Sequence, residues 1–201
     1  MISRKGFDMK YRIIFGVIVF LAGCKEKADT SKSVPSPAKN ESVSATHTFS
    51  APDSFKAGLG KVYGGYIQVQ EALAADDFQK AKQAFSSMHG ILHMIPEDNL
   101  DSTAKAEWDS SSVSFMRVLH PMAASKDIAE MRDHLKDFTP LLSTAIEKLG
   151  IGGTVPVYLY HCPMAFGGNG ADWLQKVKIK ANPYQGKAMP DCGDLVREIK
   201  P

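Results

Sequence analysis

Sulfur and imidazole side chains gather in two short segments of the C-terminal part of the chain. The segments Tyr160-His161-Cys162-Pro163-Met164 and Met189-Pro190-Asp191-Cys192-Gly193 hold two thiols, two thioethers and one imidazole. Soft sulfur donors are the ligands that Cu(I) prefers. Neither segment is a zinc motif, because the tail has no C-x-x-C pair and no second histidine. The chemistry that these residue types indicate is therefore the binding of a soft metal ion.

The two cysteines have a second interpretation, because exported proteins often form disulfides. A Cys162–Cys192 bridge would close a loop of about 30 residues and stabilise the fold by roughly 3.5 kcal/mol in the chain-entropy model. Met164 and Met189 would then be ordinary core residues packed against Trp173. Both interpretations stay open, and a methionine beside each cysteine favours the metal site slightly.

Catalysis finds little support in the sequence. There is no nucleophile elbow, no glycine-rich phosphate loop and no motif that pairs an acid with a base. Cys162 beside His161 would be a free thiol of low pKa, which an oxidising compartment tends to consume. We therefore expect a protein that is not an enzyme and that holds no organic cofactor.

The first residues are typical of a bacterial lipoprotein signal. Four basic residues precede an apolar run, 13–21, that ends in Leu21-Ala22-Gly23-Cys24. The run is shorter than the roughly 20 residues that span a bilayer. This junction resembles a lipobox, so we predict removal of residues 1–23 as a signal peptide and acylation of Cys24, including palmitate. The protein would be anchored to a lipid membrane facing the periplasm, and Lys25 favours the outer membrane.

The segment that follows the predicted lipid anchor is polar. Residues 24–52 are rich in Ser, Lys, Glu, Ala and Pro and predict a flexible tether rather than a folded element. The signal holds four of the 24 basic and one of the 22 acidic residues, so the mature chain has 20 basic against 21 acidic residues. This balance gives no reason to expect a nucleic-acid partner.

From residue 53 onward, apolar residues recur at helical spacing in four stretches. They predict helices over about 55–73, 78–95, 101–122 and 128–149, with Asp76 or Asp77 capping the second, Ser125 capping the fourth and Gly150 ending it. Four glycines weaken the first helix unless a close contact requires them. Short connections favour an all-α, antiparallel four-helix bundle.

Residues 53–201 are expected to form one domain. Its C-terminal motif region, from about residue 155, should be an irregular tail that contains the Cys and Met residues and packs on the bundle. A short helix over 194–199 should close the chain. His89 and His93 share a helical face, but the sequence shows no third donor near them, so ligation by this pair is only a minor possibility.

Several motifs occur in a defined order along the tail. They are Cys162-Pro163-Met164-Ala165, Gly170, Trp173-Leu174, Ile179, Asn182-Pro183-Tyr184, Gly186, Met189 and Cys192-Gly193, preceded by His120 and by matches at 125–128 and 132–135. In these residues the chain resembles a helical domain of unknown function found in periplasmic proteins of copper-handling bacteria. The same domain is appended to some heavy-metal (copper/silver) efflux adaptor, or membrane-fusion, proteins.

This resemblance implies a set of metal ligands and a partner. The ligands are His120, His134, Cys162, Met164, Met189 and Cys192, with Cu(I) as the metal and a heavy-metal efflux adaptor as the partner. The chain has Pro190 where the family commonly has a polar residue or histidine, so His161 is a candidate replacement ligand. The alternative is a disulfide-stabilised interaction module that docks on an efflux or envelope partner without metal.

The lipoprotein prediction is tested by Cys24→Ala. Without the thiol no diacylglycerol can be attached, so the variant should leave the membrane fraction on cell fractionation, whereas the wild type stays in it. A variant that remains membrane-bound like the wild type would show that Cys24 is not the anchor.

Overall fold

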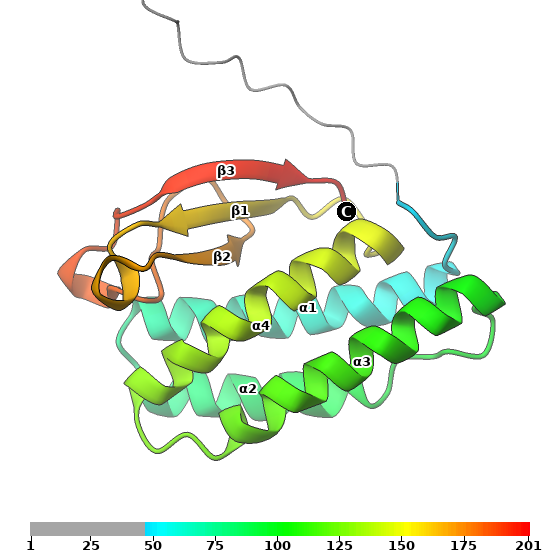
Figure 1. The fold of residues 1–201 in the computed structure, drawn as a ribbon, viewed down its shortest axis with the longest axis horizontal. Helices are drawn as coiled ribbons and strands as arrows, with labels where there is room; N and C mark the ends of the chain where they lie inside the picture. Colours follow the sequence, from blue (N-terminus) through cyan, green and yellow to red (C-terminus); the bar gives the residue numbers. More distant parts are fainter. Residues whose placement is uncertain (1–46) are drawn as a thin grey trace, which may run out of the picture. The chain divides into compact units, whose positions relative to one another are not determined.

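The computed structural model describes residues 47–201, which contain four α-helices and a three-stranded sheet (Figure 1). The helices are α1 (Asp53–Ala74), α2 (Phe78–Leu92), α3 (Ser102–Ala123) and α4 (Ile128–Leu149). The strands are β1 (Val157–Cys162), β2 (Ala171–Gln175) and β3 (Asp194–Ile199), with 3₁₀ turns η1 (Ala165–Gly168) and η2 (Gly186–Ala188) between them. The predicted signal peptide, Cys24 and most of the tether lie outside the described residues. None of the helices in residues 47–201 is both long and apolar enough to cross a membrane.

The four predicted helices are confirmed, and aspartate side chains begin three of them. Asp77 and Asp101 begin α2 and α3, each accepting a main-chain N–H bond of 2.9 Å from the first turn. Asp127 does the same for α4, again at 2.9 Å. The prediction that Ser125 caps α4 was therefore wrong: Ser125 is buried, and its hydroxyl has no partner among residues 47–201. Gly150, with φ of 77°, ends α4 as predicted.

The C-terminal region forms a sheet, so the prediction of an all-α fold with an irregular tail was wrong there. β1 is the central strand and pairs antiparallel with β2 and β3. Residues 194–199, predicted as a short helix, are strand β3. Six residues are too few for a helix that is stable by itself, whereas pairing with β1 satisfies main-chain donors and acceptors of β3.

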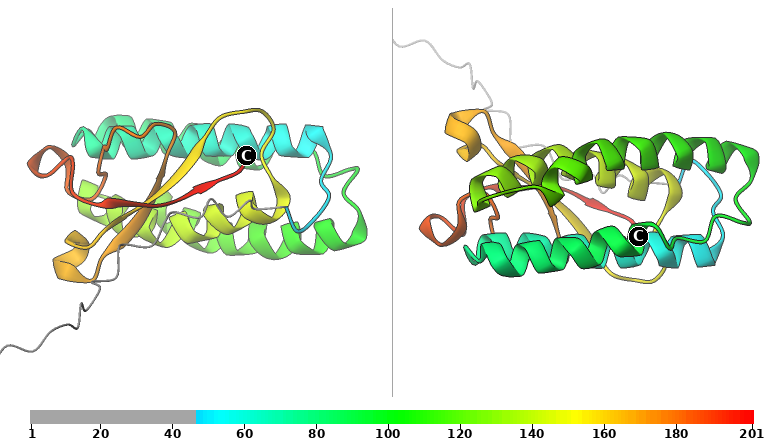
Figure 2. Two further views of the ribbon diagram at one scale, coloured as in Figure 1. Left: turned by 90° about the horizontal axis from the view of Figure 1, so that it is seen from above. Right: turned by 90° about the horizontal axis from the view of Figure 1, so that it is seen from below.

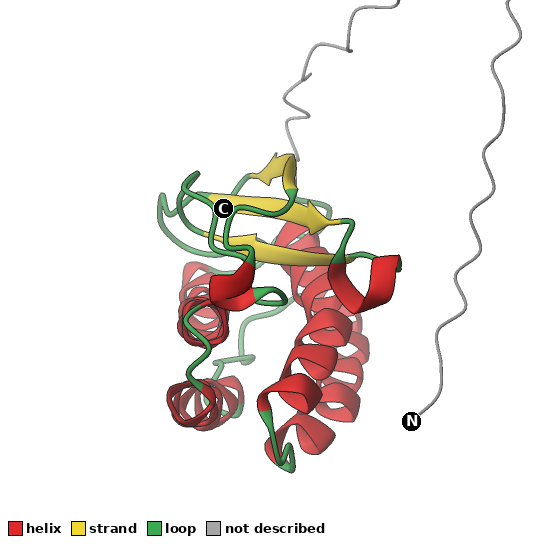
Figure 3. Ribbon diagram, turned by 90° about the vertical axis from the view of Figure 1, so that its left-hand side faces the viewer, coloured by secondary structure: helices red, strands yellow, loops and turns green. Residues whose placement is uncertain are grey.

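The helices and the sheet form layers. The sheet lies on the flank formed by α1 and α4, and β2 contacts both of these helices (Figure 3). α2 packs on α1 and α3 packs on α4, on the side away from the sheet. The tail therefore covers one apolar flank of the bundle and leaves α2 and α3 uncovered by it.

Two of the glycines in α1 allow close packing. A Cβ added at Gly65 would lie 2.7 Å from the Cβ of Met88 on α2, and one at Gly58 would lie 3.2 Å from the side chain of Ile95. Gly64 has no such neighbour within 4 Å in the described part of the chain. The entropic cost of a helical glycine, about 1 kcal/mol relative to alanine, is thus compensated by close contact at the first two positions and not at Gly64.

This difference predicts opposite effects from two neighbouring substitutions. Gly64→Ala should raise the free energy of unfolding by about 0.5–1 kcal/mol, because it adds helix propensity without a clash. Gly65→Ala should lower it by about 1–3 kcal/mol, because α1 and α2 must move apart. Urea denaturation measures both, and equal effects from the two changes would contradict the packing of α1 on α2 described above.

Candidate functional site

Cys162 and Cys192 come together at one end of the sheet. Cys162 is the last residue of β1 and is fully buried, whereas Cys192 lies in the turn before β3 and is half-buried. Their sulfur atoms are 3.2 Å apart, and both are free thiols in this structure. Figure 1 shows the loops after β1 and before β3 at the same end of the sheet. The antiparallel pairing of β1 with β3 thus joins two segments that are 30 residues apart in sequence.

The loop that carries Cys192 is held by Asn182, which is fully buried. The Asn182 side-chain amide donates to the carbonyl of Cys192 at 2.7 Å, and its main-chain N–H donates to the carbonyl of Pro190 at 3.0 Å. Its side-chain oxygen accepts the N–H of Tyr184 at 2.8 Å. Asn182 therefore holds Cys192 through its side-chain NH2, while its side-chain oxygen fixes the turn that follows Asn182.

Gly193 allows this loop to pass close to β1. Its φ is 119°, and a Cβ there would lie 2.6 Å from the carbonyl oxygen of His161 and 2.6 Å from the ring of Trp173. A side chain at this position would push the loop, and Cys192 with it, away from Cys162.

An ion pair fastens the loop after Asn182 to the end of the bundle. Arg132 on α4 donates to the carbonyl of Pro183 at 2.6 Å and pairs at 2.6 Å with Asp76, in the turn between α1 and α2. Asp76 also accepts the N–H of Lys187 at 3.0 Å. The Lys187 N–H and, next, Arg132 lower the pKa of Asp76. The contribution of this carboxylate to stability is present at neutral pH and is lost as the pH falls below the usual aspartate pKa of 3.8.

Met164 and Met189 lie in the same two loops as the thiols. Their side chains are 57% and 41% exposed, so they are not the core residues that the disulfide interpretation expects. The main-chain N–H of Met164 hydrogen-bonds to the sulfur of Cys192, and the N–H of Cys192 donates to the carbonyl of Met189 at 3.2 Å. The Met164 N–H thus links the first loop to Cys192 of the second, and both thioethers remain exposed.

The surroundings of Cys192 disfavour a thiolate while no cation is present. The hydrogen bond with Cys162 raises the pKa of Cys192 most, and burial raises it further. The Met164 N–H and the positive charge of Lys180 act in the opposite direction and do not outweigh these effects. A metal ion that binds the two sulfurs must therefore displace protons.

His161, the candidate replacement ligand, lies on the opposite face of β1 from Cys162, because successive residues of a strand point to opposite sides. Its Nδ1 is 2.6 Å from a carboxylate oxygen of Asp172, the residue that faces it across the β1–β2 pair. The imidazole is therefore engaged in an interaction that does not involve the thiols.

In the described residues, the predicted histidine ligands do not form a metal-holding group with the two thiols. His120 is exposed on α3, where its ring packs against His89 of α2 with 6.2 Å between ring centroids. His134 is half-buried on α4. Within residues 47–201, no three His, Cys, Asp or Glu side chains gather their donor atoms as a metal ion would require. The thioethers of Met164 and Met189, in the same two loops, are the further soft donors that the sequence places beside the thiols.

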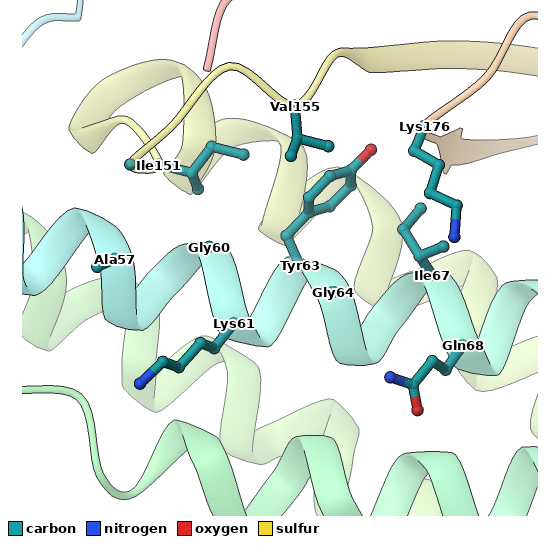
Figure 4. Close-up of a pocket in the computed structure, with 11 residues that line it drawn as sticks. Ala57, Gly60, Lys61, Tyr63, Gly64, Ile67, Gln68, Ile151, Val155 and Lys176 are labelled. Carbon is teal, nitrogen blue, oxygen red and sulfur yellow. The ribbon is translucent and has the colours of Figure 1, made fainter.

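A groove of about 430 Å³ runs along α1, away from the thiols. Its floor includes Gly60 and Gly64, which have no side chains, and apolar residues 151 and 155 form one wall (Figure 4). Tyr63 lies across it and donates its hydroxyl to the carbonyl of Pro156 at 3.1 Å. Lys61 and Lys176 are at the rim. None of the residues that line the groove is a metal ligand predicted from the sequence.

Comparison with known proteins finds one family model that matches part of the chain. Residues 62–152 match a family model described as a protein of unknown function (DUF3347). The matched segment covers most of the bundle and ends before the sheet. The predicted sulfur ligands, at positions 162, 164, 189 and 192, therefore lie outside it. No curated protein and no solved structure matches the chain.

The short distance between the thiols predicts that a mild oxidant forms a Cys162–Cys192 disulfide in the folded protein. Disulfides have sulfur atoms about 2.05 Å apart, so a small approach suffices. Oxidation should raise the free energy of unfolding by about 2–4 kcal/mol and protect both thiols from alkylation. Cys192→Ser should gain no stability from the same treatment. Oxidation that leaves the wild-type thiols free would contradict the observed proximity.

Proposed function

We propose that this protein is an exported lipoprotein that binds one soft heavy-metal ion, most favourably Cu(I), in periplasmic metal handling or efflux. The observation that carries the proposal is the pair of thiols 3.2 Å apart, with Met164 and Met189 exposed in the same two loops. The ligands are Cys162 and Cys192, assisted by Met164 and Met189. His120 and His134, suggested by the family resemblance, are not needed in this site.

The donor set favours Cu(I) over harder ions. Thiolates and thioethers are soft ligands, and soft ligands select Cu(I). Zinc gains little from a thioether and in structural sites almost always takes four nitrogen, sulfur or carboxylate ligands. Two thiolates and two thioethers suit a soft ion better.

The exposure of the methionines supports an exchangeable site. Met164 and Met189 are 57% and 41% exposed in the two loops that carry the thiols, so both thioethers are accessible from solvent. A thioether on a surface loop can reach an incoming ion and release it to another protein. This is the property that metal handling or delivery to an efflux adaptor needs.

A disulfide-stabilised interaction module is the second candidate function. It is favoured by the same short sulfur distance and by apolar side chains exposed on the tail. Ile179 is 81% exposed, and Val177 and Val196 are nearly half exposed. Such residues could contact an efflux or envelope partner without any metal.

A Cu(I) competition titration distinguishes the two functions. The full-length protein, purified reduced in detergent with Cys24→Ser so that Cys162 and Cys192 are the only thiols, competes with a chromophoric Cu(I) chelator. We expect one Cu(I) per chain. Met164→Leu with Met189→Leu should weaken Cu(I) binding at least about tenfold without changing its pH dependence, because thioethers carry no proton. Cys162→Ser should weaken binding and also reduce its pH dependence.

Two controls accompany the titration. Met94→Leu replaces a methionine that is 72% exposed on the bundle and should leave Cu(I) affinity unchanged. Zn(II) affinity should be insensitive to the methionine changes. If Cys162→Ser with Cys192→Ser competes for Cu(I) as well as the parent does, the sulfur residues are not a metal site and the interaction module is the better interpretation.

A further inference from the structure

The two residues of the thiol pair differ in their access to solvent. Cys162 is fully buried and belongs to the apolar core, whereas Cys192 is half-buried and packs against that core. The left-hand view of Figure 2 shows η1 and η2, which lie close to the two cysteines in the sequence, at the end of the sheet away from the C-terminus. A molecule in solution can therefore approach Cys192, and the folded protein shields Cys162 from it.

The buried thiol is already in position to react with the sulfur of Cys192. The two sulfur atoms are 3.2 Å apart, and they would have to approach to about 2.05 Å to form a disulfide. The turn that carries Cys192 is held next to β1 because Gly193 has no side chain to push it away from His161 and Trp173. A hydrogen bond of 2.7 Å from the Asn182 amide to the Cys192 carbonyl holds it there. Little movement is therefore needed to close the bond.

We propose that the thiol pair carries out thiol–disulfide exchange with a partner that presents an accessible disulfide. Cys192 is the residue that reacts with the partner, because it is the one that is exposed in part. Cys162 is the residue that completes the exchange, because it is buried within 3.2 Å of the first sulfur. Accessible sulfurs take part in exchange, whereas buried thiols are inert towards molecules in solution. This activity is distinct from Cu(I) binding.

The exchange takes place in two steps through a mixed disulfide. The Cys192 thiolate attacks one sulfur of the partner disulfide, whose S–S bond breaks and releases one partner thiolate. The Cys162 thiolate then attacks the sulfur of Cys192, forms the Cys162–Cys192 bond and displaces the second partner thiolate. The two protons lost by the cysteines are taken up by the two partner thiolates. The protein is thus oxidised by two electrons, and the partner disulfide is reduced by the same two.

Exchange would also regulate the proposed metal site. Cu(I) binds thiolates, and a Cys162–Cys192 disulfide contains none, so bound Cu(I) and the disulfide exclude each other. Oxidation by a partner would therefore release Cu(I), and bound Cu(I) would by linkage protect the thiols from exchange. This consequence rests on the proposed function, whereas the exchange reaction itself does not.

Oxidised glutathione is the probe for the exchange, because its disulfide is small and accessible. The parent is the reduced full-length protein in detergent with Cys24→Ser, so that Cys162 and Cys192 are the only thiols. Mass spectrometry should find the intramolecular disulfide with no glutathione attached, and two molecules of reduced glutathione should be released per chain. In Cys162→Ser the reaction should stop at a mixed disulfide, with one glutathione attached per chain.

Cys192→Ser is the matched control, because it keeps only the buried thiol. It should react with oxidised glutathione at least about tenfold more slowly than Cys162→Ser, because access limits the reaction. In concentrated urea the two variants should react at similar rates, because neither thiol is then buried. Excess reduced glutathione should return the oxidised parent to the dithiol form, which a structural disulfide would resist.

The proposal is overturned if Cys192→Ser reacts as fast as Cys162→Ser in the folded protein, if Cys162→Ser acquires no glutathione, or if the oxidised parent resists excess reduced glutathione. A separate measurement addresses the metal. Cu(I) added to the parent before oxidised glutathione should slow disulfide formation at least about tenfold. Exchange at an unchanged rate would count against the Cu(I) site and leave the exchange reaction standing.

Discussion

The hydroxyl of Tyr66 lies where α1, α4 and β2 meet, and the attachment of the sheet to the bundle depends on it. It bonds with the hydroxyl of Thr139 on α4 at 2.8 Å and accepts the N–H of Leu174 on β2 at 3.1 Å. Thr139 in turn donates to the carbonyl of Leu135 at 2.9 Å, so each hydroxyl has one donor role and at least one acceptor role. The whole group is buried, and loss of one member would leave the others unsatisfied at a cost of about 1–3 kcal/mol each.

The thiol pair is assembled from segments that the bundle alone could not hold together. β1 is fixed through its neighbour β2, which rests on α1 and α4. The loop with Cys192 is fixed through Asn182, and the residues after Asn182 through Arg132 and Asp76 at the end of the bundle. Neither sulfur is therefore positioned by local structure only. The rigid helical layer acts as the support on which two otherwise irregular loops are kept in contact.

The helices could be predicted from the sequence because their signal is local. Apolar side chains at helical spacing identify each inward face within one segment, and Asp77 was predicted as a cap of α2. The caps of α3 and α4 were not identified: Asp101 was not named, and Ser125 was named in place of Asp127. The strands depend on distant partners. The alternation around Val157 and Leu159, in β1, is present in the sequence. β3 has only one buried residue, Ile199, and it pairs with β1 although β2 and two 3₁₀ turns lie between these strands in the sequence.

The candidate sites were predictable to different degrees for the same reason. Residue type alone singled out Cys162 and Cys192, because sulfur chemistry limits what they can do. The short distance between the two cysteine sulfurs depends on the pairing of β1 with β3. The exposure of Met164 and Met189 depends on the conformation of the two loops. The contact of His120 with His89 depends on how α3 is placed against α2 after the connection at residues 93–101. No local pattern determines that placement.

The first described residues, 47–49, contact the end of α4 and the C-terminal residue. His47 lies 2.9 Å from the carbonyl oxygen of Pro201 and 3.3 Å from that of Glu147, and the N–H of Phe49 donates to the carbonyl of Lys148 at 2.9 Å. These contacts are at the end of α4, whereas the thiols are at the other end of the sheet (Figure 1). A lipid anchor upstream would hold the domain by one pole. The sulfur loops lie at the opposite end of the sheet, so a protein that reaches them does not meet the entry point of the chain.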